Sequence, residues 1–344
     1  MFLLYRANLR YAIYMLRLAT YIFILLASGQ TAWAQDCTSH EAALAIENDS
    51  TLTLGGGTDR YYSNGFEALF KCHTNPNNES TQSNLAFRTL NWFENNSNFI
   101  KTSKGFKFGQ KIHTSSDLTL SPEEIDTNRD RPYAGWIYAS FFYEAETLQD
   151  RYLRHEFSLG CVGPCSQAEN SQTEWHELFG FVRPEGWDLQ IKNQLALQYF
   201  LEYKTNRYNI FPFISLHPRY KASLGTILNV VSFGGEFIVG DKSNEQLSEL
   251  NYKHKKWGWQ LFLHNDIKLV AFNGTLEGSL FNNSSPHTVS PSRVVLENGV
   301  GIRLNYNNQY SFQYRFIGRS TENEEQDWKF WDHKYGSFEF GFGF

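Results

Sequence analysis

Alternation of apolar and polar residues is the feature that most limits how this chain can fold. Between Val300 and Phe316 the apolar residues keep one parity on each side of the Asn307-Asn308 turn, and polar residues occupy the other parity. This pattern is typical of a β-hairpin with one apolar and one polar face. The chain also ends in an alternating segment, 338–344, that closes on Phe344. The pattern therefore predicts strands whose two faces meet different surroundings.

Similar runs occur along the whole chain and bring the expected number of strands close to twelve. They lie near residues 41–54, 60–72, 84–93, 105–114, 134–146, 150–162, 190–204, 208–217, 219–232, 234–240 and 257–272. We expect an all-β chain that forms a closed antiparallel barrel from residue 41 to Phe344. The alternative is a soluble periplasmic β-sandwich, whose outward faces should be more polar than these.

Composition favours a barrel that spans a membrane. Aromatic residues make up 17% of the chain and charged residues 19%, while the mean hydropathy is only −0.46. In a transmembrane barrel every second residue faces lipid, so the mean hydropathy stays low. So much aromatic surface excludes disorder. The net charge of −5 and the lack of a basic run exclude a nucleic-acid partner.

The N-terminal segment predicts export. It carries three arginines and no acidic residue, followed by a ten-residue, mainly apolar run at 18–27 and the small-x-small site Ala32-Trp33-Ala34. We expect residues 1–34 to be a signal peptide and residues 35–344 to be the barrel domain. The alternative, an anchor helix, would need a longer apolar run. The C-terminal aromatic resembles the terminal signal of bacterial outer-membrane barrels, so we expect the outer membrane of a Gram-negative cell, with the protein as a monomer.

The four cysteines suit an oxidising compartment. If the glycine turn 55–57 centres between its first two residues, Cys37 lies within two residues of the position opposite Cys72. The register therefore predicts a disulfide between them. Cys161 and Cys165 are spaced to close a small loop, and no second pair of ligands nearby indicates zinc.

The same register groups polar oxygens at the other end of this hairpin. It places Asn48 opposite Ser63 and Asp49 opposite Tyr62. Amide, carboxylate and hydroxyl oxygens in one group suit a hard cation such as Ca²⁺. The alternative is a polar pair at the rim with no ion.

A second polar segment, Asp130 to Trp136, precedes an expected strand. Asp130 and Arg131 could form a structural ion pair at the base of a loop. Arg131 could instead bind a phosphate group of a substrate, since its planar guanidinium suits that geometry.

A short helix is expected within the β chain. Ser171 to Glu174 reads as a capping box, and Gly180 suits the helix exit. We expect this helix to lie in an extracellular loop.

The faces of this helix suggest a site. Gln172 and His176 are four residues apart and lie on one face. Trp175, Leu178 and Phe179 form an apolar face, which we expect to turn toward the barrel. The alternative is an ordinary lid helix that carries an incidental histidine. No Gly-x-Ser-x-Gly or His-Glu-x-x-His motif is present.

Together these segments resemble the LpxR-type lipid A 3′-O-deacylases. The matching segments, in order, are Ile46 to Asp49, Thr58 to Gly65, Gly109-Gln110, Asp130 to Trp136, Gly160 to Pro164, Gln172 to His176 and Gly186 to Gln190. The resemblance implies a twelve-stranded barrel with its site between the wall and a loop helix. It implies Ca²⁺-dependent removal of the 3′-linked acyloxyacyl group of lipid A, the lipid part of lipopolysaccharide.

The resemblance also implies roles for individual residues. His176 would activate water, with Gln172 and Asn48 as further catalytic residues. Asn48, Asp49 and Ser63 would bind the Ca²⁺, which would polarise the ester carbonyl. Two features depart from the family pattern. Residues 114–128 contain no Lys or Arg, and a family glutamate aligns with Val182.

Two other functions fit the same pattern. A barrel with a structural or passive-transport role that has lost catalysis would explain the missing loop cations. An outer-membrane phospholipase acting on glycerophospholipids would use similar chemistry.

Overall fold

The computed structural model describes residues 37–53, 60–78, 83–93, 98–240, 256–281, 284–307 and 309–344. The predicted signal peptide and the glycine turn 55–57 lie outside the described residues. Within these ranges, no helix combines the length and the apolar character that crossing a membrane requires.

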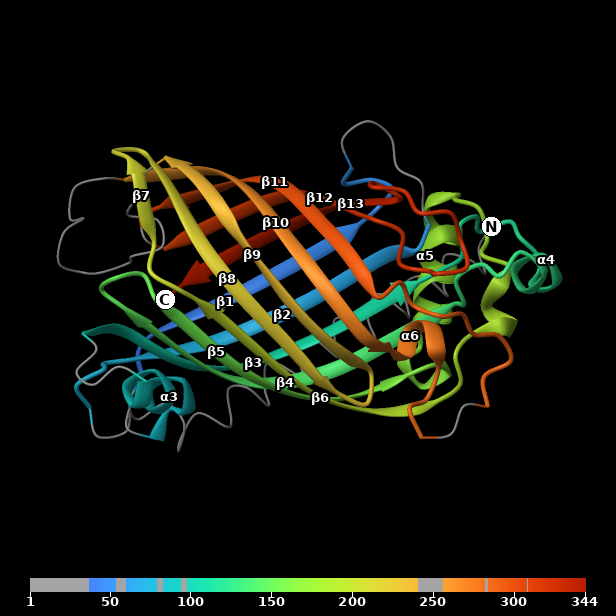
Figure 1. The fold of residues 1–344 in the computed structure, drawn as a ribbon, viewed down its shortest axis with the longest axis horizontal. Coiled ribbons are helices and arrows are strands. Elements are labelled where there is room, and N and C mark those ends of the chain that lie inside the picture. Colours follow the sequence, from blue (N-terminus) through green and yellow to red (C-terminus); the bar gives the residue numbers. More distant parts are fainter. Residues whose placement is uncertain are drawn as a thin grey trace, which may run out of the picture.

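Twelve antiparallel strands form a closed barrel (Figure 1), which confirms the predicted architecture. They are β1 Cys37–Asn48, β2 Tyr62–Thr74, β3 Phe99–His113, β4 Ala134–Thr147, β5 Tyr152–Val162, β6 Gln194–Lys204, β8 Ile214–Gly225, β9 Leu228–Gly240, β10 Trp257–Asn273, β11 Val294–Tyr306, β12 Tyr310–Arg319 and β13 His333–Gly343. Pairing of β1 with β13 and of β6 with β8 completes the ring. The short strand β7, Tyr208–Phe211, pairs with β8 alone among the described strands.

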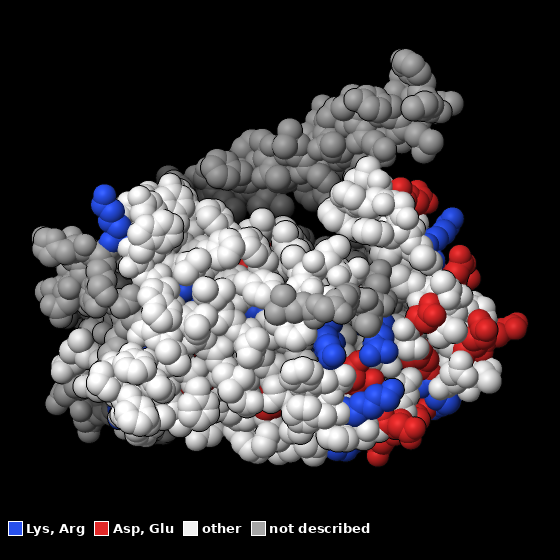
Figure 2. Space-filling view, turned by 90° about the horizontal axis from the view of Figure 1, so that it is seen from above, with Lys and Arg blue, Asp and Glu red and all other residues white. Residues whose placement is uncertain are grey.

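The two faces of the wall differ as the alternation predicts. On β1, Leu44 and Ile46 are exposed on the outside, and Figure 2 shows a wall with few charged residues between its two ends. The inward side chains include many charged groups held in ion pairs. They are Lys71–Glu144, Lys107–Glu156, Arg154–Glu144, Arg219–Asp266, Arg303–Glu236, Lys268–Glu297 and Arg319–Glu297. Pairing offsets the cost of removing these charges from water.

The C-terminal aromatic residue closes the seam between the first and last strands. Phe344 and His40 exchange two backbone hydrogen bonds of 2.8 and 2.9 Å. Their rings stack with centroids 5.6 Å apart. The terminal phenylalanine is thus part of the wall.

Both predicted disulfides are present, with Cα separations of 5.5 Å for Cys37–Cys72 and 6.1 Å for Cys161–Cys165. The predicted register of the first hairpin is wrong by one residue, because Asn48 pairs with Asn64. Register follows the buried and exposed faces of two strands, and a slip of one residue would reverse them. A bulge after Cys37 absorbs the offset and still brings the two sulfur atoms together.

Residues 84–93, predicted as a strand, form helix α3, Leu85–Phe93. The Asn84 side chain accepts the N–H of Phe87 and caps the helix. The buried residues Ala86 and Leu90, one turn apart, pack with residues of β4 and β5. A helical spacing was therefore mistaken for alternation.

The strand boundaries predicted between residues 208 and 240 are also wrong. The hairpin turn lies at 226–227, between β8 and β9, and Pro218 sits within β8 opposite Gly235. At Gly234, an added Cβ would lie 1.9 Å from the Asn265 carbonyl oxygen. These glycines permit close strand packing and do not mark a strand end.

The remaining helices gather at one end of the barrel, here called the α5 end, whereas α3 lies at the other (Figure 1). They are α4 Pro122–Thr127, η2 Pro164–Ser166, α5 Ala168–Phe179, η3 Gly186–Leu189 and α6 Gly274–Glu277. A cluster of buried apolar side chains packs this end together. Its members are Ile112, Leu118, Ile125, Tyr133, Ala168 and Trp187.

Candidate functional site

The three residues of the predicted oxygen cluster lie together where β1 ends, joined through the Ser63 main-chain carbonyl. The Asn48 amide donates from Nδ2 to the Ser63 carbonyl at 3.0 Å, and the Asp49 N–H donates to the same carbonyl at 3.4 Å. Asp49 and Ser63 are almost completely buried, with 0% and 1% of their surface exposed. Asn48 has the same parity as Leu44 and Ile46. The cluster therefore begins on the outer face of the wall.

Hydrogen bonds hold the oxygens of this cluster in place. The Ser63 hydroxyl lies 2.6 Å from the Thr114 hydroxyl, and one Asp49 carboxylate oxygen accepts the N–H of Arg60. The Asn48 side-chain oxygen accepts the backbone N–H groups two and three residues further along the chain. Asn48 thus closes a local turn and also fixes the Ser63 carbonyl.

The chemistry of this donor set fits a hard cation. Its side-chain ligand atoms are all oxygens, and one belongs to a buried carboxylate, which is the type that Ca²⁺ prefers. The described residues contain no group of three or more His, Cys, Asp or Glu that could hold a metal. Asp49 would therefore be the main charged ligand, and a low ligand charge gives weak binding.

Helix α5 differs from the prediction at its start and agrees at its end. It begins at Ala168, with Gln167 in the left-handed conformation as its N-cap, so the capping box at Ser171 is wrong. The hydroxyl of Ser171 instead donates to the Gln167 carbonyl. Gly180 terminates the helix with φ +71°, as expected.

The two faces of α5 carry the predicted residues, but the predicted direction of the apolar face is wrong. Gln172 and His176 share the buried face, whereas Trp175, Leu178 and Phe179 are exposed. The apolar face therefore does not turn toward the barrel, because small and polar side chains occupy the contact with the wall.

The ring of His176 is oriented by the backbone just beyond the helix. The left-handed Gly180 reverses the chain, and the Val182 carbonyl oxygen then accepts a hydrogen bond from His176 Nδ1. A carbonyl only accepts, so Nδ1 carries a proton, and in the neutral ring Nε2 carries the lone pair. This is the tautomer that a general base requires.

Gln172 is placed by the segment after the helix. Its Oε1 accepts the indole N–H of Trp187 at 3.2 Å. Its Nε2 is buried and has no hydrogen-bond partner among the residues that the structure describes. An unsatisfied buried donor costs about 1–3 kcal/mol, which a ligand oxygen could recover.

Strand β3 connects the oxygen cluster to α5. Thr114, just beyond this strand, contacts Ser63. Two residues earlier, Ile112 belongs to the apolar cluster that includes Trp187. Trp187 in turn donates to Gln172. The two groups of predicted site residues therefore lie at the same end of the barrel, beside the same strand.

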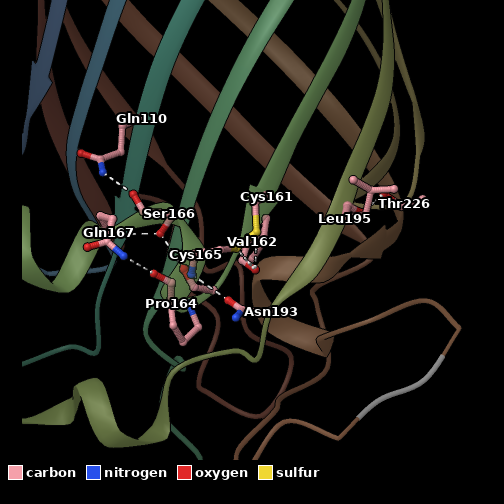
Figure 3. The surroundings of a disulfide bond; sticks show 12 residues. Gln110, Cys161, Val162, Pro164, Cys165, Ser166, Gln167, Asn193, Leu195 and Thr226 are labelled. Carbon is pink, nitrogen blue, oxygen red and sulfur yellow. Dashed lines mark hydrogen bonds between the residues drawn. A yellow bond between two sulfur atoms is a disulfide. The ribbon is translucent and has the colours of Figure 1, made fainter. Parts of the chain in front are cut away.

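A disulfide fastens the start of α5 to the outside of the wall (Figure 3). Cys161 has the same parity as the exposed Leu159 and therefore faces outward. Its bond to Cys165 holds the turn that leads into the helix. Next to this turn, Gln110 of β3 donates to the Ser166 carbonyl at 2.7 Å. Helix α5 thus starts on the outer face.

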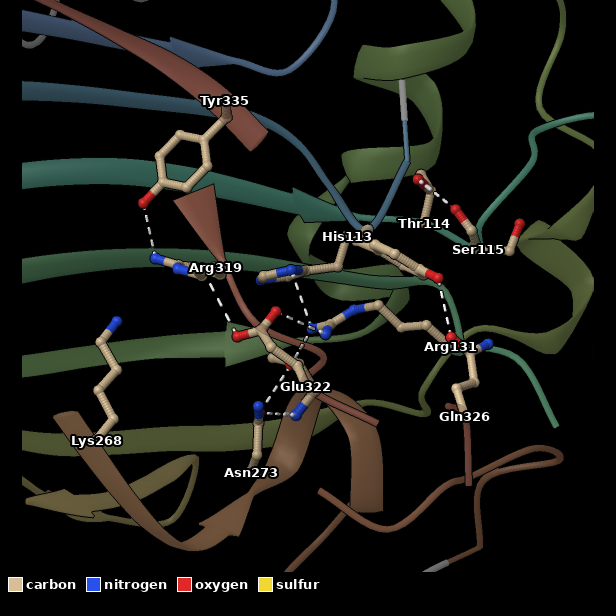
Figure 4. Close-up of polar contacts among 12 residues, drawn as sticks. His113, Thr114, Ser115, Arg131, Lys268, Asn273, Arg319, Glu322, Gln326 and Tyr335 are labelled. Carbon is tan, nitrogen blue, oxygen red and sulfur yellow. Dashed lines mark hydrogen bonds and ion pairs between the residues drawn. The ribbon is translucent and has the colours of Figure 1, made fainter. Parts of the chain in front are cut away.

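Arg131 is placed inside the barrel mouth (Figure 4). It is buried, donates to the Thr275 hydroxyl at 2.7 Å and lies 3.0 Å from His113 Nδ1. Its ion-pair partner is Glu322 at 3.4 Å, and not the expected Asp130. Burial lowers the pKa of Arg131. The structure thus shows Arg131 in an ion pair and hydrogen bonds within the mouth, and its predicted contact with a substrate phosphate stays a prediction.

Three contributions to this site were missed from the sequence. They are the Thr114 hydroxyl, the Trp187 indole and the Val182 carbonyl. To predict the roles of Thr114 and Trp187, one would have to know which segments lie next to one another in the folded chain. A backbone carbonyl leaves no signal in a sequence.

Comparison with known proteins agrees with this architecture. The family profile described as Outer membrane protein LpxR matches residues 18–344. The chain belongs to the LpxR family. The solved structure of LpxR from Salmonella typhimurium is similar in fold, with a TM-score of 0.66 and 17% identity over 88% of this chain and 99% of that chain.

More distant barrels resemble this LpxR-family chain less. The β domain of the Bordetella autotransporter BrkA has a TM-score of 0.44 and 8% identity, covering 88% of this chain and 98% of that chain. No curated protein sequence matches the chain. As a member of the LpxR family, the chain is an outer-membrane β-barrel.

Proposed function

We propose that this protein is an outer-membrane ester hydrolase that removes the 3′-linked acyloxyacyl group of lipid A. The observation that carries this proposal is the buried histidine of α5. His176 lies on the face of the helix that meets the outer wall, in the tautomer of a base. Family membership supplies the substrate class.

The position of the site suits a lipid substrate. The long connection 163–193 carries α5, and long connections of outer-membrane barrels are extracellular. A site on the outside of the wall at that end can be reached from the outer leaflet without a pore.

The reaction would use His176 twice. Nε2 accepts a proton from water while the water oxygen bonds to the ester carbonyl carbon. The tetrahedral intermediate then expels the sugar alkoxide, which takes this proton back from Nε2. The products are a carboxylic acid and a free hydroxyl group.

Gln172 and Asn48 would support this step in different ways. The Gln172 Nε2–H can donate to a substrate oxygen, because it has no partner among the described residues. Asn48 positions the Ser63 carbonyl and the turn before Arg60. A Ca²⁺ bound by Asp49, Ser63 and Asn48 would polarise the ester carbonyl and stabilise the oxyanion.

Mass spectrometry of membrane lipids tests this proposal. Cells that express the protein, cells without it and cells that express His176→Ala should be compared for both lipid A and glycerophospholipids. Loss of one acyloxyacyl group from lipid A, only with the wild-type protein, is the expected result. Loss of acyl chains from glycerophospholipids would indicate a phospholipase. No change in either lipid would favour a structural or transport barrel.

A further inference from the structure

Helix α5 carries a continuous apolar surface that the barrel does not cover. Trp175, Leu178 and Phe179 on the helix, with Phe181 and Val182 just after it, each expose 44 to 59% of their surface. These five residues are here called the aromatic face. Patches of this kind on soluble surfaces mark a contact with another apolar partner.

The rings of the aromatic face form a path to the candidate base. The Trp175 and Phe179 rings lie 4.5 Å apart, and Phe179 stacks on Phe181 at 6.1 Å. Phe181 in turn meets the His176 ring edge to face at 5.7 Å. An acyl chain lying on these rings would therefore end beside the histidine.

The start of α5 lies close to the lipid-facing part of the wall. Gln110, which bonds to the turn before α5, pairs across the wall with the exposed Phe66. Two residues beyond Gln110 on β3, or about 7 Å along the strand, Ile112 pairs with Gly135 of β4. A Cβ on Gly135 would lie 2.2 Å from the Cβ of Ala168, so the helix starts directly against the wall at this level.

Around its axis, α5 has three kinds of surface. At 100° per residue, Gln172 and His176 point to the wall, while Trp175 lies near the centre of the aromatic face and Leu178 at its edge furthest from the wall. The exposed Glu177 lies about 100° or more from both surfaces. An apolar side apart from a charged side is the pattern of a helix at a membrane surface, with Trp, Phe and Leu on the side that meets the acyl chains.

We propose that the aromatic face of α5 is immersed among the acyl chains of the outer leaflet and guides one chain to His176. Its partner is lipid, because the face continues the apolar outer wall. The immersion follows from the geometry alone, and only the guidance of a substrate chain rests on the proposed function.

Spin labelling tests the immersion without any enzyme assay. All four cysteines are in disulfides, so Leu178→Cys and Glu177→Cys each supply one free thiol. In phosphatidylcholine vesicles containing lipopolysaccharide, a nitroxide at 178 should collide more with oxygen than with a water-soluble nickel chelate. A nitroxide at 177 should collide more with the nickel chelate than with oxygen. Equal exposure of both labels to the nickel chelate would overturn the proposal.

A second test concerns guidance of the substrate. Leu178→Glu should lower hydrolysis of lipid A in vesicles at least tenfold, and Leu178→Phe should restore it. Glu177→Gln is the matched control and should keep the wild-type rate. Heat-modifiable migration on gels shows that each barrel is folded. A fully active Leu178→Glu would refute the guidance. An inactive wild-type protein with a lipid-exposed label at 178 would refute the proposed function and leave the immersion intact.

Discussion

In His176 the ring nitrogen Nδ1, which is not the proposed base atom, donates to a backbone carbonyl. In many catalytic histidines the corresponding nitrogen donates to a carboxylate. Val182 occupies the position at which the LpxR-type pattern has a glutamate, and its carbonyl oxygen accepts the Nδ1 proton. A main-chain group therefore orients the ring. This geometry depends on Gly180, whose left-handed conformation turns the chain back toward the ring.

Replacing His176 should greatly slow the reaction and leave the barrel folded. We expect His176→Ala to lower the rate of lipid A deacylation by about 10²–10⁴-fold, as loss of a general base usually does. The side chain lies outside the closed hydrogen-bond network of the barrel, so heat-modifiable migration should be unchanged. Deacylation by the purified variant is the measurement, and full activity would remove His176 from the mechanism.

The dependence of activity on Ca²⁺ should require the Asp49 carboxylate. Because this site has one buried carboxylate among neutral oxygens, we expect half-maximal activity at about 10⁻⁴–10⁻³ M Ca²⁺. Asp49→Ala should abolish the response to Ca²⁺, whereas Asp117→Asn, at an exposed loop position, should keep it. Activity that survives a chelator in the wild-type protein would contradict the metal role.

At the scale of elements, the short disulfide loop decides where α5 lies. Cys161 belongs to the wall and Cys165 to the turn before the helix. The bond between them, together with Gln110 and Ser166, transmits the position of β3 and β5 to the buried face of α5.

Removing this disulfide should loosen α5 selectively. For so short a loop the chain-entropy model gives about 2 kcal/mol. We expect Cys161→Ser/Cys165→Ser to speed amide hydrogen exchange in residues 168–179 and to reduce activity. Cys37→Ser/Cys72→Ser, at the opposite end of β1 from the oxygen cluster, is the control and should leave exchange in α5 unaltered. Identical exchange in both double variants would show that other contacts hold the helix.

At the scale of the whole molecule, ion pairs of buried and half-buried side chains join strands and loops into one unit. Arg131 connects the β3–β4 loop to Glu322 in the β12–β13 loop. Burial opposes ionisation of Glu322, but Arg319 and Arg131 beside it hold its pKa below the ordinary value of 4.5. A depressed folded-state pKa contributes stability above pH 4.5, and this is lost as the pH falls through the folded value.

Acid should therefore weaken the mouth of the barrel through Glu322. We expect the thermal midpoint of the wild-type protein in detergent to fall as the pH drops below about 4.5. Glu322→Gln should be less stable by about 1–3 kcal/mol at pH 7, because Arg131 loses its charged partner. The difference between the two proteins should shrink in acid. A constant difference from pH 7 to pH 3 would show that this carboxylate is not the titrating group.

The sequence by itself determined the class of fold. Alternation, the terminal Phe344, low hydropathy and the cysteine spacing predicted a barrel of about twelve strands and both disulfides. These features act locally, because each strand must present one face to lipid and the other to the interior. Local patterns also predicted that Asn48, Asp49 and Ser63 would meet, since one hairpin joins them.

Only the tertiary structure decided how the helices and charges are used. Alternation misread α3 because apolar residues at helical spacing can imitate a strand, and the register of β1 depends on both its neighbours. The sequence showed that α5 has an apolar side but not where it points, since that depends on the wall and the Cys161–Cys165 loop. The sequence left Arg131 either paired with Asp130 or binding a phosphate, yet Glu322, far along the chain, is its ion-pair partner. Contacts between distant segments carry no local signal, and they decide which way α5 faces and which carboxylate pairs with Arg131.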